Sequence, residues 1–363
     1  PTPTETPIPP PNVLAINPNQ GLNNQDIPVT IIGQNFIPAP FPVARLFSGE
    51  GSHTISLSAA TTTHLDGVVP AGIAPGVYAL QVTNDDGQSN ILSPAYTAIE
   101  PSATQLETGR VSIFGPAALP TDGDPDHKQE IYFEVPDGCA APLYIHVYDA
   151  DTGGGVDELF GGGETTMRYT LSGSAELATI VVGEDAFYDE AWRSLFGPYD
   201  PSAGNLRGNS RVFRLMIEGL TGSDGNIYDV RLSGDPMNST APCGGARIYA
   251  YSWALPLYDG SARRLYAYVP AGTSTFTQYN FDLDNAGGAM TLYTPLNTIP
   301  ITAISGDAEW ASSSHPVDTL ESGTTWTVLM HFTGLTINDM TFRAQGDGQP
   351  LAIFTQPTTD SAP

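Results

Sequence analysis

The chain has 363 residues and a net charge of −26, although only 14 % of its residues are charged. A chain this acidic repels nucleic-acid phosphates and anionic membranes, so neither is an expected partner. No apolar run approaches the roughly 18 residues that span a membrane, so we expect no membrane insertion. The 38 glycines and 32 prolines, combined with 40 % hydrophobic residues, indicate many short strands joined by turns. The composition therefore predicts an all-β protein.

Residues 1–11, PTPTETPIPPP, are rich in proline and threonine and predict an extended arm without a core. Such an arm is either a flexible linker or glycosylated stalk, or a segment that packs on another domain or on a neighbouring copy. The residues that follow, Asn12–Ile16, suit strand pairing better than the prolines do. Because the sequence begins at Pro1 rather than Met, we expect a mature, secreted chain.

Residues 12–100 carry a recognisable pattern. The run VLAINP at 13–18 leads to VTIIGQNF at 29–36, then to VPAG at 69–72 and GVYALQVTNDDG at 76–87. This segment resembles an IPT/TIG domain, the immunoglobulin-like module found in many bacterial surface proteins. The resemblance implies a β-sandwich and no particular activity. The alternation of apolar and polar residues in these runs also predicts strands with one buried face.

The remainder contains an internal repeat. The stretch Tyr132–Glu158 returns as Tyr266–Gly288, and in each copy a strand ends at Val-Pro-x-Gly before a second strand runs into an acidic turn. Arg231 and Arg343 fall at equivalent places near the ends of the two copies. Self-similarity at this distance predicts two related structural units, and their many short strands favour jelly-roll-like β-sandwiches. The expected domains are residues 101–240 and 244–357.

The first copy is longer because of an insertion at 184–210. Within it, Asp185–Phe196 has a capping aspartate, an aromatic stripe and a following Gly-Pro stop, which together predict a helix. Such a helix would close one end of its own sandwich, or would dock on another subunit.

Carboxylates gather in the loops of both copies. Because like charges repel, such clusters either remain solvated without a metal or hold a cation, and oxygen ligands from flexible loops suit Ca²⁺. The candidate ligands in the first copy are Asp122, Asp124, Asp126, Asp149, Asp151, Asp157 and Glu158, and the weaker candidates in the second are Asp282, Asp284 and Asn285.

Cys139 and Cys243 are the only cysteines, and in an extracellular protein we expect them to pair, although two unrelated buried thiols are the alternative. Asn238 begins an Asn-Ser-Thr glycosylation sequon in a segment that is expected to lie at the surface. The six histidines have no metal-ligand spacing, and no hydrolase motif occurs, so we expect no enzyme.

The duplicated modules and the arm favour an extracellular structural subunit that associates with copies of itself in a filament, sheath or surface layer. The alternative is an adhesin or carbohydrate-binding ectodomain that uses exposed aromatic side chains. A third possibility is an accessory region of a secreted enzyme.

Overall fold

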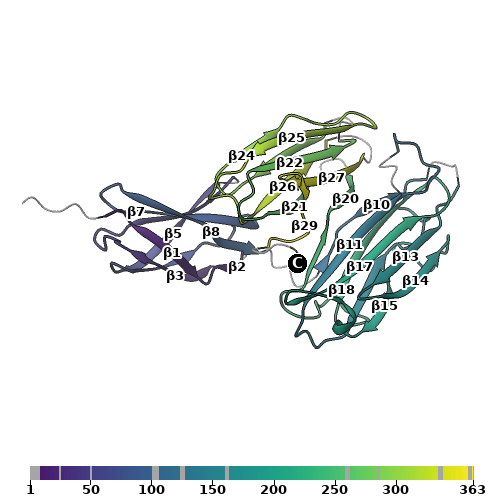
Figure 1. The fold of residues 1–363 in the computed structure, drawn as a ribbon, viewed down its shortest axis with the longest axis horizontal. Helices are drawn as coiled ribbons and strands as arrows, with labels where there is room; N and C mark the ends of the chain where they lie inside the picture. Colours follow the sequence, from purple (N-terminus) through teal and green to yellow (C-terminus); the bar gives the residue numbers. More distant parts are fainter. Residues whose placement is uncertain are drawn as a thin grey trace, which may run out of the picture.

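In the computed structural model, the described residues form β-strands and turns with one short 3₁₀ helix, Pro201–Ala203, and no α-helix. The all-β prediction is confirmed. No described helix has the length and apolar character that crossing a membrane requires. Figure 1 shows three β-sandwiches, of which the third in sequence lies between the other two. The structure describes residues 9–23, 26–49, 51–99, 106–122, 127–159, 163–257, 262–283, 287–333, 338–358 and 362.

The N-terminal sandwich is one rolled sheet with the strand order β1-β3-β6-β5-β4-β7-β8-β2. The long strand β5 pairs with β4 through its first half and with β6 through its second half, and so passes between the two layers. Alternate residues, such as Val29 and Ile31, point into a separate core. The strands are β1 Asn12–Asn17, β2 Gln20–Leu22, β3 Ile27–Gln34, β4 Val43–Ser48, β5 Gly51–Ala60, β6 His64–Val69, β7 Gly76–Thr83 and β8 Ser89–Ile99.

The middle sandwich packs the strands β14-β13-β17-β11 against β10-β18-β12-β15. In chain order this is the arrangement of a jelly roll, whose eight strands fold as two interleaved Greek keys. Two short strands, β9 and β16, extend the sheets. The strands are β9 Leu106–Glu107, β10 Val111–Phe114, β11 Lys128–Pro136, β12 Leu143–Tyr148, β13 Met167–Ser172, β14 Glu176–Val182, β15 Trp192–Tyr199, β16 Asn205–Arg207, β17 Ser210–Gly219 and β18 Gly225–Ser233.

The C-terminal sandwich has the same order, β24-β23-β26-β21 against β20-β27-β22-β25. Side-chain geometry repeats too: Arg231 lies over Trp192 at 3.8 Å in the first jelly roll, and Arg343 lies over Trp310 at 3.7 Å in the second. The strands are β19 Arg247–Ala250, β20 Ser252–Leu257, β21 Ala262–Val269, β22 Thr275–Phe281, β23 Ala289–Tyr293, β24 Thr298–Ile301, β25 Trp310–Pro316, β26 Thr324–His331, β27 Asn338–Gly346, β28 Gln349–Pro350 and β29 Ile353–Phe354.

The two jelly rolls share one sheet. Strand β19 pairs with β11 of the first jelly roll, β29 pairs with both β19 and β21, and the result is a continuous eleven-stranded sheet. The buried apolar side chains of both jelly rolls accordingly form one cluster. The two repeats are therefore joined through backbone hydrogen bonds as well as side-chain packing.

The N-terminal sandwich contacts the second jelly roll through the end of β4. The backbone N–H of Gly49 donates to the carbonyl of Thr294 at 2.9 Å, and the Thr298 hydroxyl donates to the carbonyl of Gly49. A Cβ added at Gly49 would lie 2.2 Å from the carbonyl oxygen of Asn297, so only glycine fits this approach.

The predicted helix at Asp185–Phe196 is wrong. Residues 186–190 form turns, and Trp192–Tyr199 is strand β15 at the edge of its sheet. Register shifts in the pairing of β12 with β15 interrupt regular alternation, and Phe187 is exposed while Phe196 is buried. The aromatic spacing that suggested a helical stripe thus comes from a turn followed by an irregular edge strand.

Cys139, in the turn after β11, forms a disulfide with Cys243, which lies shortly before β19. Asn238 is exposed in the segment between β18 and β19. Of the arm at 1–11, only residues 9–11 belong to the described part, where the Asn35 side chain donates to the carbonyl of Pro10.

Candidate functional site

A row of aligned side chains crosses the outer face of the shared sheet. The row runs from one jelly roll to the other, and its middle is aromatic. In order, the paired residues are Ser172, Arg214, Tyr132, Tyr249, Phe354, Tyr266, Thr327, Tyr293 and Thr298. Tyr249, Tyr266 and Phe354 form a small buried cluster apart from the main core. The row arises because β11 alternates inward Ile131 and Phe133 with outward polar and aromatic residues.

The two ends of this row differ. At the Thr298 end, the N-terminal sandwich contacts the sheet through Gly49. The Tyr132 end opens into a groove of about 410 Å³. We call this the tyrosine groove, and its lining is Tyr132, Ser172, Gly173, Asn205, Arg207, Val212, Arg214, Tyr249 and Tyr251.

Three tyrosines form the aromatic side of the tyrosine groove. The rings of Tyr132 and Tyr249 are stacked, 5.2 Å apart and 9° from parallel. Tyr251 meets both edge-on, at 5.6 Å and 5.9 Å, and remains 38 % exposed. Such offset and perpendicular contacts fix the rings in place while leaving one aromatic surface open to a ligand.

Charged groups surround these rings. The Tyr132 hydroxyl donates to a Glu130 oxygen at 2.6 Å, and the other Glu130 oxygen lies 3.5 Å from the Arg214 guanidinium. Burial, then the hydrogen bond to Glu130, raises the pKa of Tyr132, so its hydroxyl stays protonated. Arg207 is exposed on β16. The tyrosine groove thus offers two guanidinium groups in a molecule that is otherwise strongly acidic.

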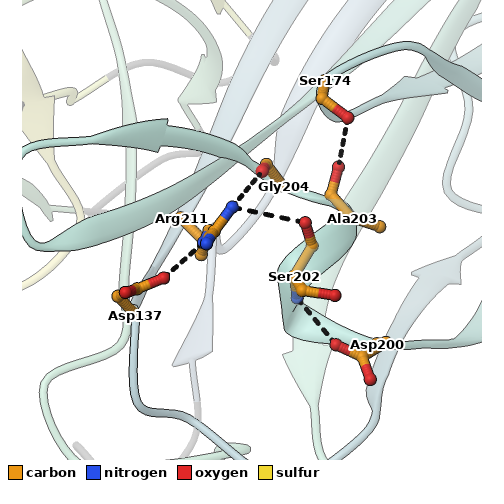
Figure 2. A network of polar contacts seen from close by, with 7 residues as sticks. All are labelled: Asp137, Ser174, Asp200, Ser202, Ala203, Gly204 and Arg211. Carbon is orange, nitrogen blue, oxygen red and sulfur yellow. Dashed lines mark hydrogen bonds and ion pairs between the residues drawn. The ribbon is translucent and has the colours of Figure 1, made fainter.

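The far wall of the tyrosine groove is held by a polar network (Figure 2). Arg211 pairs with Asp137 and donates to the carbonyls of Ser202 and Gly204, both at 3.4 Å. Asp200 accepts from the Ser202 backbone at 2.8 Å, which begins the 3₁₀ turn before β16. These contacts fix the segment that carries Asn205 and Arg207, so this wall is formed before any ligand arrives.

The wall and the loop after β13 also fit closely together. The Ser174 hydroxyl and backbone N–H both donate to the carbonyl of Ala203. A Cβ at Gly173 would lie 2.1 Å from that same carbonyl oxygen, so a larger residue would force the two loops apart.

A second candidate site, which we call the acidic corner, consists of Asp149, Asp151 and Asp189. One oxygen from each lies within 4.8 Å of the others. Asp149 and Asp151 are fully buried, and neither oxygen of Asp149 has a hydrogen bond of normal geometry. One oxygen each of Asp151 and Asp189 is likewise buried without a partner. Four carboxylate oxygens therefore remain unsatisfied in one small space.

The surrounding backbone positions the acidic corner. Asp149 follows β12 directly and has a positive φ of 56°. This backbone turn accompanies the complete burial of the Asp149 side chain. The second oxygen of Asp151 accepts from the Asp185 backbone at 2.6 Å, and its carbonyl accepts from the buried Asn226 amide. Asp189 belongs to the turn before β15, so the acidic corner joins two loops at one end of one sheet.

Electrostatics at the acidic corner disfavours ionisation. Burial raises the pKa of Asp149 to about 6, the neighbouring charges of Asp151 and Asp189 add to the rise, and the Glu190 N–H and Arg110 oppose it. Burial also raises the pKa of Asp151. Three close carboxyl groups can all be charged only if a cation compensates them.

The other predicted ligands of the first copy do not belong to this cluster or lie outside the described residues. Asp122 accepts from the Leu119 backbone, and Asp157 accepts from the backbones of Gly153 and Ile227, both at 2.7 Å. Asp157 thus orders the glycine-rich turn that follows Asp151. Asp124 and Asp126 lie outside the described residues.

In the second copy, Asp282 is buried and has a φ of 52°, as at the equivalent Asp149. Asp284 and Asn285 lie outside the described residues. Asp307 precedes Trp310 by the same three residues that separate Asp189 from Trp192, but it is exposed.

Glu158 faces the buried Asp339 of the second jelly roll, so these two acids meet at the contact between the repeats. Burial raises the pKa of both carboxyl groups. The charge of Asp339 and the hydrogen bond with it raise the pKa of Glu158 further, whereas hydrogen bonds with Glu158 and Ser112 partly lower that of Asp339. Asp339 also lines a small cavity together with Ser112, Lys128 and Thr341.

Sequence reasoning missed Asp189 and the tyrosine groove. Asp189 was assigned to a helix, where its side chain would have faced solvent. The available sequence signal is that Tyr132 and Tyr249 each occupy an outward position of a strand, between neighbours that point into the core. Only the pairing of β11 with β19, across more than a hundred residues, brings them together.

No protein-family model matches the sequence, and no curated protein is significantly similar to it. Among solved structures, an auxiliary nutrient-binding protein of Bacteroides ovatus is 16 % identical, with 30 % of this chain and 24 % of that chain covered and a TM-score of 0.19. The mixed-linkage glucan utilisation protein SGBP-B of Bacteroides ovatus, in complex with a heptasaccharide, is 14 % identical, with coverages of 58 % and 50 % and a TM-score of 0.18. A surface glycan-binding protein of Prevotella bryantii is 8 % identical, with coverages of 95 % and 98 % and a TM-score of 0.20.

This chain therefore spans about a quarter of the first of these proteins and half of the second. With TM-scores this low, the likenesses carry no argument about fold, ligand or activity.

Proposed function

We propose that this protein is an extracellular, non-enzymatic carbohydrate-binding protein, and that the tyrosine groove holds a segment of glycan. The observation that carries the proposal is the open end of the aromatic row, where the 38 % exposed Tyr251 stands beside the stacked pair Tyr132–Tyr249. Sugar rings have apolar C–H faces and polar hydroxyl edges. A tyrosine surface flanked by polar groups complements both.

The polar lining supports the same class of ligand. Arg207, Arg214 and the Asn205 amide supply donors and acceptors at the rim, where they can meet hydroxyl groups or a sugar carboxylate. Because Arg211 already fixes one wall, binding would cost little ordering of the protein.

The test is binding to a panel of soluble neutral and uronic-acid polysaccharides, followed by calorimetry on any oligosaccharide that binds. Tyr251→Ala should weaken binding about tenfold, which is roughly 1.4 kcal/mol, because it removes the exposed aromatic surface. Arg207→Ala should weaken the binding of an acidic glycan more than the binding of a neutral one.

Trp310→Ala is the matched control, because Trp310 is 39 % exposed but lies on the opposite sheet of the second jelly roll. The proposal fails if no member of the panel binds. It also fails if Trp310→Ala abolishes binding while Tyr251→Ala leaves it intact.

Self-assembly through the N-terminal arm remains a separate prediction. The segment expected to pair with a neighbour, Asn12–Ile16, belongs to β1, which pairs with β3 of its own chain and lies at one end of the strand order. Electron microscopy of the purified protein distinguishes filaments and layers from single particles.

A further inference from the structure

We propose that Asp149, Asp151 and Asp189 bind one calcium ion at the acidic corner of the first jelly roll. The proposal is independent of glycan binding, because the acidic corner belongs to the sheet β10-β18-β12-β15 and the tyrosine groove lies on the shared sheet.

The unsatisfied oxygens carry the argument. Buried carboxylates are normally hydrogen-bonded or paired, because an unpartnered buried charge costs several kcal/mol. Here both oxygens of Asp149 lack a hydrogen bond of normal geometry and one oxygen of Asp151 has no partner, in side chains that are 0 % exposed, and a buried oxygen of Asp189 joins them. The convergence of these oxygens is explained if a cation lies among them.

The donor set indicates which cation. All of the ligands are carboxylate oxygens, the set that hard cations prefer, and neither sulfur nor imidazole is part of the cluster. Calcium accepts an irregular ligand sphere of six to eight oxygens, which loops of different origin can supply together with water. Magnesium demands a near-ideal octahedron and suits such a site less well.

The neighbouring hydrogen bonds hold the ligands in place without using the free oxygens. The Asp185 N–H fixes one oxygen of Asp151, and the backbone N–H of Gly155 donates to Glu190, the residue after Asp189. A bound ion would therefore fasten the glycine-rich turn after β12 to the turn before β15.

Calcium titration of chelator-treated protein, followed by calorimetry and thermal unfolding, tests this site. We expect one ion per chain and a rise in the unfolding temperature with Ca²⁺, because a ligand that binds only the folded state stabilises it. Mg²⁺ at equal concentration should give a smaller rise. No binding at millimolar Ca²⁺, or equal effects of the two ions, would overturn the assignment.

Variants separate a metal site from a merely structural cluster. Asp149→Asn and Asp189→Asn should each weaken calcium binding by roughly tenfold or more. In chelator, both should unfold no more easily than the parent, because they remove repulsion between like charges. Asp85→Asn, which changes the same charge at an exposed turn of the N-terminal sandwich, should leave binding unchanged.

A variant that loses the same stability with and without Ca²⁺ would contradict the proposal. Terbium provides a second readout, because Tyr148 adjoins Asp149 and its ring lies 5.6 Å from that of Trp192. Aromatic excitation should sensitise bound Tb³⁺, and Ca²⁺ should displace it. Absence of this emission from the parent protein, or its persistence in Asp149→Asn, would also count against the site.

Discussion

At the residue scale, several carboxyl groups are buried at positions where burial disfavours their ionisation. Glu158 and Asp339 meet inside the contact between the jelly rolls, where burial raises the pKa of both. Asp122 and Asp157 add negative charge nearby. The folded protein therefore holds protons here that the unfolded chain releases above about pH 4, the ordinary range of carboxyl groups.

This arrangement predicts a pH-dependent stability. The contribution of Glu158 and Asp339 to the free energy of unfolding is fully present below about pH 4. It is lost as pH rises toward the raised pKa values, since the folded state binds more protons than the unfolded chain. Each extra proton held by the folded state makes the free energy of unfolding fall by up to about 1.4 kcal/mol per pH unit. Glu158→Gln removes one such proton, so the free energy of unfolding of this variant should fall less steeply as pH rises. Urea unfolding between pH 5 and pH 9 measures it.

Glu309→Gln, an exposed position, serves as the control for that experiment and should retain the slope of the parent. If Glu158→Gln also retained it, the two carboxyl groups would not share a proton in the folded protein.

At the scale of elements, sequence predicts best the strands that have a regularly buried face. Alternate or continuous apolar residues mark β17 and β26 as such strands. β25 carries no such signal, because its residues Trp310–Pro316 alternate only between exposed and half-buried at a sheet edge. The helix predicted over the start of β15 is wrong for the related reason that the edge pairing of β15 is irregular.

The candidate sites show the same limit. Asp149 and Asp151 were identified from their place at a strand end, which is a local property of the sequence. Their third partner, Asp189, required the pairing of β12 with β15, which the sequence alone did not indicate. The tyrosine groove depends in the same way on the distant pairing of β11 with β19.

The disulfide belongs to this scale, because it ties the turn after β11 to the segment before β19 across 104 residues. Replacing both Cys139 and Cys243 by Ser should lower the free energy of unfolding by about 2–4 kcal/mol, since a long loop of the unfolded chain is released. Denaturant unfolding measures the change, and the reduced parent protein should match the double variant. An unchanged midpoint would contradict this expectation.

At the scale of the whole molecule, the contacts of the N-terminal sandwich with the second jelly roll include one close backbone approach. Gly49 lies against Asn297 and exchanges hydrogen bonds with Thr294 and Thr298. These contacts lie at the end of the aromatic row that is furthest from the tyrosine groove.

Gly49→Ala should therefore loosen the N-terminal sandwich, because its Cβ would overlap the carbonyl of Asn297. Small-angle scattering should show a larger radius of gyration while each sandwich remains folded. Gly138→Ala, where an added Cβ meets nothing within 4 Å, is the matched control. Identical scattering from both variants would show that this contact does not orient the sandwich.

Strand β29 has a consequence for the order of events during synthesis. The first jelly roll holds all eight of its own strands once β18 has been made, and so it can collapse while later residues are still being added. The bridge between β19 and β21 requires Ile353–Phe354, which follow every other strand of both repeats. Until β29 has been made, β19 and β21 lack the strand that joins them, so each has an unpaired sheet edge. Chaperones could bind these edges only during that interval of translation.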